Sequence, residues 1–241
     1  MAEPVVLLHG FAGTHRAWDA VVGALGAQRY IAAPVDLRGH GAAAGLRPIT
    51  FAACVDDVLA AAPPRFALCG YSLGGRIALH VALAAPSRVS RLILVATTAG
   101  IEDPDERAAR RATDRALADA VAAGTIEDFV ARWSAQPLFA GDPPELAAAW
   151  QDDMRRNEPA ALAAVLRGIG TGEMDPLWDR LGELAMPAVV LAGERDTKFT
   201  ALGERLAAQL PAARLVIVRG AGHGLPREAP EAVAQVLSPV A

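Results

Sequence analysis

The sequence predicts an α/β protein in which helices flank a mostly parallel sheet and a long helical segment is inserted between two strands. Short apolar runs alternate with longer amphipathic ones, which is typical of parallel strands joined by crossover helices. The turn GYSLG, residues 70–74, follows an apolar run and opens an amphipathic one. The chain has 241 residues, 53% of them hydrophobic, which suffices for one large core.

Six short apolar runs are expected to be strands, and the amphipathic runs that alternate with them are expected to be helices. The strands are Val5–Leu8, Tyr30–Val35, Phe66–Cys69, Leu92–Ala96, Ala188–Ala192 and Leu215–Val218. The helices cover about residues 15–26, 51–62, 73–85, 200–210 and 228–237.

The segment from Ile101 to Ala185 breaks this alternation, because it contains no convincing strand. It is rich in alanine, arginine and acidic residues, and turn signals divide it at Gly124 and at residues 141–144, 158–159 and 168–172. It is too long for a loop. We therefore expect a core of residues 1–100 and 186–241, with residues 101–185 forming a helical lid, here called the cap, over the carboxyl edge of the sheet.

Composition excludes several classes of partner. The net charge of −4 does not favour nucleic acid or an anionic membrane surface. No apolar run reaches about 18 residues, so no transmembrane helix is expected. The N-terminus carries Glu3 and no basic run, so no signal peptide is expected, and Cys54 and Cys69 do not make a disulfide framework. These features favour a cytoplasmic monomer or small homo-oligomer that acts on a small molecule.

Ser72 has the sequence context of a nucleophile elbow. This turn between a strand and a helix is so tight that the neighbours of the serine must be small, as Gly70, Gly74 and Gly75 are. The helix N-terminus that follows favours developing negative charge. The alternative is a glycine-rich turn with a buried serine that does no chemistry.

A nucleophilic serine needs a base and an orienting acid, and in this arrangement the chain order is serine, acid, histidine. His223 follows the last predicted strand and Asp196 follows the one before, so both are expected at carboxyl ends of strands. Glu194 is the rival acid, but Asp196 is further out in the loop and better placed to reach His223. A solvated loop histidine is the alternative for His223.

The loop HGFAG, residues 9–13, follows the first strand and is expected to form an oxyanion hole. The backbone N–H groups of Phe11 and Leu73 would point at a developing negative charge. His9 is expected to brace this loop, and His40 to organise its own loop rather than act in chemistry.

Arg76 is unusual because it lies one helical turn after Ser72 on the same face. A hydrolase of neutral esters has no evident use for a fixed cation beside its nucleophile, whereas an anionic substrate would be bound by it.

Together the motifs HGFAG, DLRGHG, GYSLGG, GERD and GAGH resemble the α/β-hydrolase superfamily, in its usual order and over nearly the whole chain. That resemblance implies the α/β-hydrolase fold but says little about the reaction.

A closer resemblance is to the 2-succinyl-6-hydroxy-2,4-cyclohexadiene-1-carboxylate synthases of menaquinone biosynthesis. It is carried by GYSLGGR, ERAARRATDRALA, FVARWSAQPLF, MRRNEPAALAAVLRG and GERDTKF. This resemblance implies a lyase that eliminates pyruvate from 2-succinyl-5-enolpyruvyl-6-hydroxy-3-cyclohexene-1-carboxylate, a polycarboxylate, without a metal or other cofactor. The residues it implies are the triad Ser72, Asp196 and His223 and the substrate ligands Tyr71, Arg76, Arg110, Trp133 and Arg155.

Three points stay open at this level. Arg111 competes with Arg110, and Arg156 with Arg155, as the side chain that faces the substrate. After His223 the run GLPREAP departs from the more polar run usual in the family.

The same triad would also serve a carboxylesterase, lactonase or thioesterase that acts through an acyl-enzyme. Esterase lids tend to be apolar, whereas this cap is rich in arginine. A fold that binds a small ligand without turning it over is the third alternative, and the complete triad argues against it.

Overall fold

A computed structural model describes residues 3–25, 30–139 and 142–238 of the chain. Six strands form one sheet in which every neighbouring pair is parallel, in the spatial order β2-β1-β3-β4-β5-β6. The strands are β1 (Glu3–Leu8), β2 (Tyr30–Val35), β3 (Phe66–Tyr71), β4 (Val89–Val95), β5 (Ala188–Gly193) and β6 (Ala213–Val218). The predicted fold class and all six predicted strands are confirmed.

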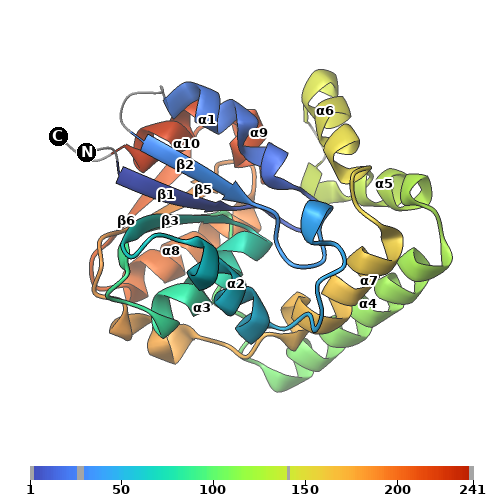
Figure 1. Ribbon diagram of the computed structural model, residues 1–241, viewed down its shortest axis with the longest axis horizontal. Coiled ribbons are helices and arrows are strands. Elements are labelled where there is room, and N and C mark those ends of the chain that lie inside the picture. The colour runs from blue at the N-terminus through green and yellow to red at the C-terminus, as the bar shows by residue number, and fades with distance from the viewer. Residues whose placement is uncertain (1–2, 26–29, 140–141, 239–241) are drawn as a thin grey trace.

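Two helical layers cover the sheet (Figure 1). Alternate strand residues face opposite layers, as the period of two requires. Val6, Leu8 and Leu68 belong to the apolar cluster shared with α2 (Phe51–Ala61), α3 (Leu73–Ala84) and α8 (Thr197–Gln209). Val5 and Leu7 belong to the cluster shared with α1 (Asp19–Leu25) and α10 (Pro230–Leu237).

Three expected elements differ in detail. The run expected to be a helix over residues 15–26 begins as a 3-10 turn, His15–Trp18, before α1. The run over residues 228–237 is preceded by a short helix, α9 (Leu225–Glu228), and α10 starts at Pro230 because proline suits the first turn of a helix. The strand β4 starts at Val89, earlier than expected, since the polar Arg91 is tolerated there by pairing with Glu3 at 2.7 Å.

Between β4 and β5, the described residues hold four α-helices, which lie beyond the carboxyl ends of the strands (Figure 1). Local sequence explains their starts. Asp103 caps α4 by accepting from the N–H groups of Asp105 and Glu106, and Thr125 forms a capping box with Asp128 at α5. The helices are α4 (Pro104–Ala123), α5 (Ile126–Ser134), α6 (Pro144–Met154) and α7 (Pro159–Ile169).

The cap contacts the core through a third apolar cluster, in which Phe129, Met154 and Leu162 pack with Ala12 from the loop after β1. The last part of the inserted segment packs differently. The 3-10 helix η5 (Trp178–Glu183) places Trp178 and Leu181 in the main core cluster beside the sheet.

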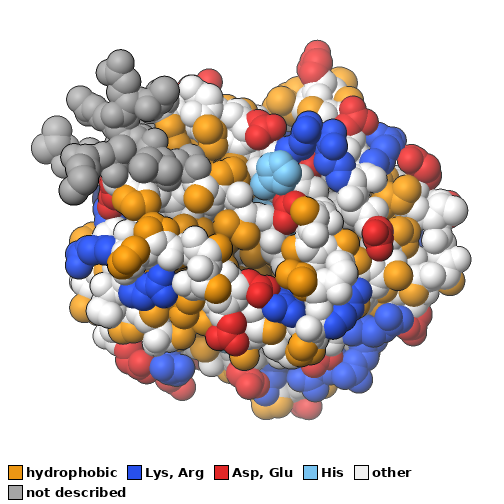
Figure 2. All heavy atoms as spheres, viewed as in Figure 1, with side chains coloured by type: hydrophobic (Ala, Val, Ile, Leu, Met, Phe, Trp, Pro, Cys, Tyr) orange, Lys and Arg blue, Asp and Glu red, His pale blue; other side chains and the backbone are white. Residues whose placement is uncertain are grey.

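On the face shown in Figure 2, positive and negative side chains are interspersed over the cap end of the molecule. Within the described ranges, no helix combines the length and apolar character needed to cross a bilayer.

The strand order positions the functional site. The chain leaves β1 toward β2 on one side, whereas β3 lies on the other side of β1. Loops after such neighbouring strands diverge and leave a crevice at the carboxyl edge. The loop after β1 carries Phe11, and the turn after β3 carries Ser72.

Candidate active site

Ser72 has the strained backbone of a nucleophile elbow. Its φ is 52° and its ψ is −108°, in a region that L residues rarely adopt. The turn leaves no room beside it, because a Cβ on Gly74 would lie 2.1 Å from the carbonyl oxygen of Leu8. The Ser72 N–H donates to Val95 at 2.9 Å, which ties the elbow to the end of β4.

The structure brings Ser72, His223 and Asp196 together from three loops. His223 Nδ1 lies 2.7 Å from Asp196 Oδ2, and His223 Nε2 lies 3.3 Å from Ser72 Oγ. His223 and Asp196 are buried. The carboxylate can only accept from Nδ1, so Nδ1 carries the proton and Nε2 is left as the acceptor for the serine hydroxyl. This is the geometry of an activated serine with an oriented base.

Asp196, not the rival Glu194, contacts the imidazole. Asp196 also caps α8 by accepting from Phe199 N at 3.2 Å, which fixes its carboxylate. Glu194 instead accepts from Gly220 N at 2.8 Å and holds the loop that leads to His223.

The N–H groups of Phe11 and Leu73, the predicted oxyanion donors, are free of protein acceptors within the described residues. Gly10 O accepts from His9 Nδ1 at 2.8 Å, and Ser72 O accepts from Thr97 Oγ1 at 2.7 Å. In a trans peptide the N–H points opposite to the preceding carbonyl, so both N–H groups are turned away from these donors. Among the described residues neither donates to a protein acceptor. They are therefore available to an oxyanion beside Ser72.

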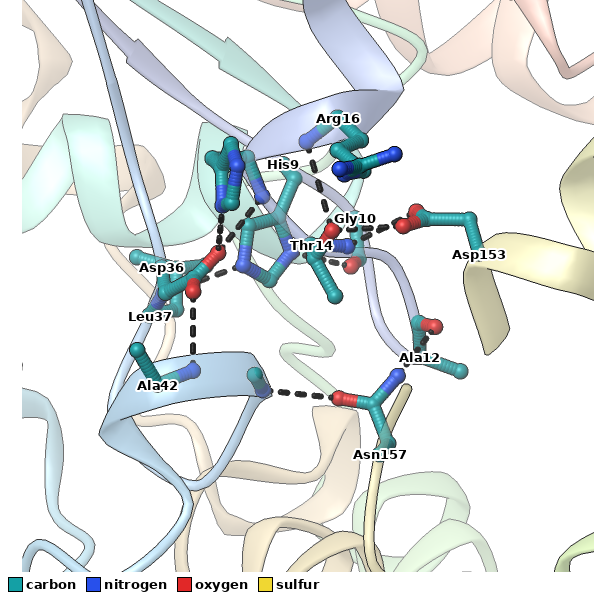
Figure 3. Close-up of polar contacts among 12 residues, drawn as sticks. His9, Gly10, Ala12, Thr14, Arg16, Asp36, Leu37, Ala42, Asp153 and Asn157 are labelled. Atoms are coloured by element: carbon teal, nitrogen blue, oxygen red, sulfur yellow. Dashed lines mark hydrogen bonds and ion pairs between the residues drawn. The ribbon is translucent and has the colours of Figure 1, made fainter. Parts of the chain in front are cut away.

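Two buried histidines support the loop of residues 9–14, called the oxyanion loop from here, and Figure 3 shows one of them, His9. His9 Nε2 accepts from Leu37 N at 3.0 Å, and His40 Nε2 accepts from Ala12 N at 3.2 Å. Burial lowers the pKa of His9, and burial lowers the pKa of His40 to about 3. Both rings are neutral at physiological pH and have structural contacts, as the sequence suggested.

Two cavities meet at Ser72. One has a volume of about 480 Å³ and lies toward α1 and α6, and the other has a volume of about 620 Å³ and lies toward α4 and α8. The residues that line both are Phe11, Ser72, Trp133, Leu138 and His223. A ligand at the serine therefore has room to extend in two directions.

Arg76 lines the larger cavity and is 7% exposed. Its guanidinium donates to Ile169 O at 2.8 Å, and within the described residues it forms no ion pair with a carboxylate. Burial lowers the pKa of Arg76 to about 10, with repulsion from Arg110 as a smaller cause, so it is still charged at neutral pH. Arg110 lines the same cavity and contacts Asp114 at 2.8 Å.

The structure shows which arginine of each adjacent pair lines a cavity. Arg110 lines the larger cavity, whereas Arg111 binds Gly172 O and Glu173 outside it. Arg155, which the family resemblance pointed to, lines neither cavity and pairs with the exposed Glu127 and Asp152. The neighbouring Arg156 lines the smaller cavity instead.

The two predicted aromatic ligands both reach the cavities. Trp133 lines both and packs edge-on against Phe11, with ring centroids 4.9 Å apart. Tyr71 lines the smaller cavity, where burial raises the pKa of its hydroxyl to about 12 and Arg227 lies beside it. Arg227 belongs to the run GLPREAP that departs from the family pattern, and it also binds Asp142 of the cap at 2.6 Å.

Sequence reasoning missed Thr97, Asp153 and Asn157. Thr97 had a signal, because it is a polar residue directly after a buried strand. Asp153 and Asn157 lie in the cap and contact the oxyanion loop across 139 and 145 positions of sequence, which no local pattern reveals.

Comparisons with known proteins find relatives over nearly the whole chain. A model of the alpha/beta hydrolase family matches residues 5–236. The 2-succinyl-6-hydroxy-2,4-cyclohexadiene-1-carboxylate synthase of Klebsiella pneumoniae (strain ATCC 700721 / MGH 78578) is 33% identical, over 98% of this chain and 92% of the relative. A Bacillus subtilis (strain 168) protein provisionally given the same name is 35% identical, over 98% of this chain and 89% of the relative. The solved structure of MenH from S. aureus has a TM-score of 0.90 and 29% identity, over 98% of this chain and 91% of that one. The chain therefore belongs to the alpha/beta hydrolase family.

Proposed function

We propose that this chain is a lyase that eliminates pyruvate from 2-succinyl-5-enolpyruvyl-6-hydroxy-3-cyclohexene-1-carboxylate to give 2-succinyl-6-hydroxy-2,4-cyclohexadiene-1-carboxylate. The names of its relatives support this reaction. The complete triad and the two free N–H donors beside Ser72 supply the base and the anion site that it needs.

The observation that carries the proposal is the buried guanidinium of Arg76, which forms no ion pair with a carboxylate of the described residues. A buried charge without a counter-ion is costly, so a site that keeps one is built for a ligand of opposite charge. Arg76 lines the same cavity as Ser72. The proposed substrate has three carboxylates, and one of them bound to Arg76 would compensate the charge and orient the ring.

The reaction begins at the ring C2–H bond, which lies between the succinyl ketone and the C3=C4 double bond. Ser72 Oγ takes this proton while its own hydroxyl proton passes to His223 Nε2, and Asp196 stabilises the imidazolium that results. The C2–H electron pair forms C2=C3, the C3=C4 pair moves to C4=C5, and the C5–O bond breaks. The leaving enolate of pyruvate then takes a proton on carbon and becomes pyruvate.

Negative charge collects on the succinyl ketone oxygen as the proton leaves. The N–H groups of Phe11 and Leu73 are the donors for this oxygen in the proposal. No acyl-enzyme forms, and the cap excludes water from the anion while the elimination proceeds. Arg110 and Arg156 would bind the other carboxylates, with Trp133 and Tyr71 packing against the ring.

We also propose that the enzyme acts in the cytoplasm on this small polycarboxylate as a monomer or small homo-oligomer, without nucleic acid or membrane insertion as partners. Both cysteines are buried free thiols, which fits a reducing compartment.

A second candidate is a serine hydrolase of small esters. The triad with two free N–H donors favours it, because this constellation also suits acyl transfer. Arg76 argues against a neutral ester as the main substrate.

Pyruvate release measured by coupling to lactate dehydrogenase, beside hydrolysis of p-nitrophenyl acetate, tests the proposal. We expect fast pyruvate release from the native protein, and Arg76→Gln to raise KM and lower kcat together. The control is Arg167→Gln, since Arg167 forms an exposed pair with Asp119 on the outer cap. Efficient ester hydrolysis without pyruvate release, or normal turnover by Arg76→Gln, would overturn the proposal.

A further inference from the structure

The oxyanion loop is held from the core side at two points. His9 Nδ1 donates to Gly10 O at 2.8 Å, and His40 Nε2 accepts from Ala12 N at 3.2 Å. Gly10 O also accepts from Gly13 N at 3.1 Å. These contacts hold the peptides on both sides of Phe11 from the core side only.

The cap holds the same loop from the opposite side (Figure 3). Asp153, the next-to-last residue of α6, accepts from Thr14 N at 2.9 Å and from Thr14 Oγ1 at 2.5 Å. Asn157, in the turn after α6, donates through Nδ2 to Ala12 O at 2.8 Å and accepts from Gly41 N at 3.0 Å. Asp153 is 7% exposed and Asn157 is 4% exposed, so water competes little for these bonds.

The backbone conformation of Ala12 explains why the loop needs the hydrogen bond from the cap. Its φ is 64°, a left-handed conformation that alanine disfavours and that surrounding contacts must impose. Its N–H is held by His40 of the core and its carbonyl by Asn157 of the cap. Release of the cap contact would let Ala12 relax, and the peptide that carries Phe11 N–H would turn with it.

We propose that Asp153 and Asn157 are positioning residues that make the orientation of Phe11 N–H depend on the seating of the cap. They touch no reacting atom and act through Ala12 and Thr14. Cap helices also carry Arg110 and Arg156 of the cavities, so binding of a polyanion across cap and core would hold the cap down and thereby order the oxyanion donor. This last step rests on the proposed function, whereas the grip on the loop serves any reaction at Ser72.

Two readouts in Asp153→Ala and Asn157→Ala test the proposal. The first is kcat and KM for pyruvate release. The second is the rate at which a small neutral fluorophosphonate modifies Ser72, followed by intact mass, because its P=O oxygen occupies the oxyanion position and needs no arginine. We expect both kcat and the modification rate to fall about 10- to 100-fold, with KM little changed, because a misoriented oxyanion donor costs less than a lost one. Asp153→Asn keeps one acceptor for Thr14 N and should recover part of the loss.

The matched control is Asp119→Asn, which removes a cap carboxylate whose ion pair with Arg167 lies at the outer surface. It should leave both rates unchanged. Circular dichroism shows whether each alanine variant folds. Where one does not, the same two rates are measured in Thr14→Val, which removes one hydrogen bond to Asp153 from the core side. An unchanged modification rate in folded variants, or a rise in KM alone, would overturn the proposal.

The result separates the two claims. If native protein releases no pyruvate but Asp153→Ala still slows the modification of Ser72, the proposed function fails and the positioning role stands. If native protein releases pyruvate and the variants match it in both readouts, the positioning role fails and the function stands.

Discussion

Thr97 Oγ1 donates to the carbonyl oxygen of Ser72 at 2.7 Å and so fixes the peptide that carries Leu73 N–H. A Cβ on Gly75 would lie 2.6 Å from Thr97 Cβ, so the threonine also fills the space behind the elbow. The end of β4 thus sets one oxyanion donor, while the loop after β1 supplies the other.

Thr97→Val keeps the shape of this side chain and removes its hydroxyl. Because Leu73 N–H is then held less firmly, we expect kcat for pyruvate release to fall about 10-fold, less than for complete loss of an oxyanion donor. KM should stay near the native value, since the substrate carboxylates keep their arginines. Thr97→Ser, which restores the hydroxyl, should recover most of the rate, and equal rates for the two variants would exclude the role of this bond.

Ser72→Ala removes the group that contacts His223 Nε2. We expect turnover to fall by about 10³-fold or more, as for other triad deletions, with binding of a substrate-like polycarboxylate retained. Steady-state pyruvate release and calorimetric titration of the variant measure the two effects. Retention of half the native rate would show that the elimination does not use the serine.

Arg155 and Arg156 are adjacent in sequence, but we expect only the substitution of Arg156 to change KM. Arg156 lines the smaller cavity, so Arg156→Ala should raise KM for the polycarboxylate about 10-fold through loss of a charge-assisted bond. Arg155 pairs with Glu127 and Asp152 at the surface, so Arg155→Ala should leave KM unchanged and cost little stability. Steady-state kinetics of the two variants measures both values of KM. A raised KM in Arg155→Ala with an unchanged KM in Arg156→Ala would mean that the cap turns when substrate binds.

Two buried histidines, His9 and His40, and the half-buried His80 make the fold acid-sensitive. Burial lowers the pKa of His9, lowers that of His40 to about 3, and lowers that of His80 to about 4. Unfolded histidines titrate near 6.5, so below that pH the unfolded chain binds more protons than the folded one and stability falls with acidification. Each group contributes a slope of up to ~1.4 kcal/mol per pH unit between its two pKa values.

The stability from His40 should therefore be complete above about pH 6.5 and decline toward pH 3. His40→Gln keeps an acceptor for Ala12 N and removes this titration. Urea unfolding between pH 4 and pH 7 should give the variant a shallower decline in unfolding free energy than the native protein. An equal decline of unfolding free energy with pH in the two proteins would mean that groups other than His40 cause the acid sensitivity.

Much of the site followed from sequence because it lies at strand ends. Asp196 and His223 lie in the loops after β5 and β6, and parallel strands bring their carboxyl ends to one edge. Which of Arg155 and Arg156 faces a cavity did not follow, because successive helical residues point about 100° apart and the rotation of a helix end is set by tertiary packing. Burial of Asp153, Met154 and Asn157 against the oxyanion loop is what sets that rotation here.

The hydrogen bonds from Asp153 and Asn157 to the oxyanion loop could likewise not be predicted from local sequence patterns. Asp153 and Asn157 look like ordinary polar residues at a helix end, where they would be solvated. Their role depends on the docking of α6 onto a loop near the N-terminus, and only the folded chain brings these positions together.

The packing of η5 has a consequence for protein engineering. Trp178 and Leu181 lie in the main core cluster, and Trp178 Nε1 donates to Gly100 O at 2.9 Å. A chimera that took the whole stretch between β4 and β5 from a relative would import part of a foreign core along with the new lid. Crossover points for exchanging substrate specificity therefore belong before η5, so that the recipient keeps its own tryptophan.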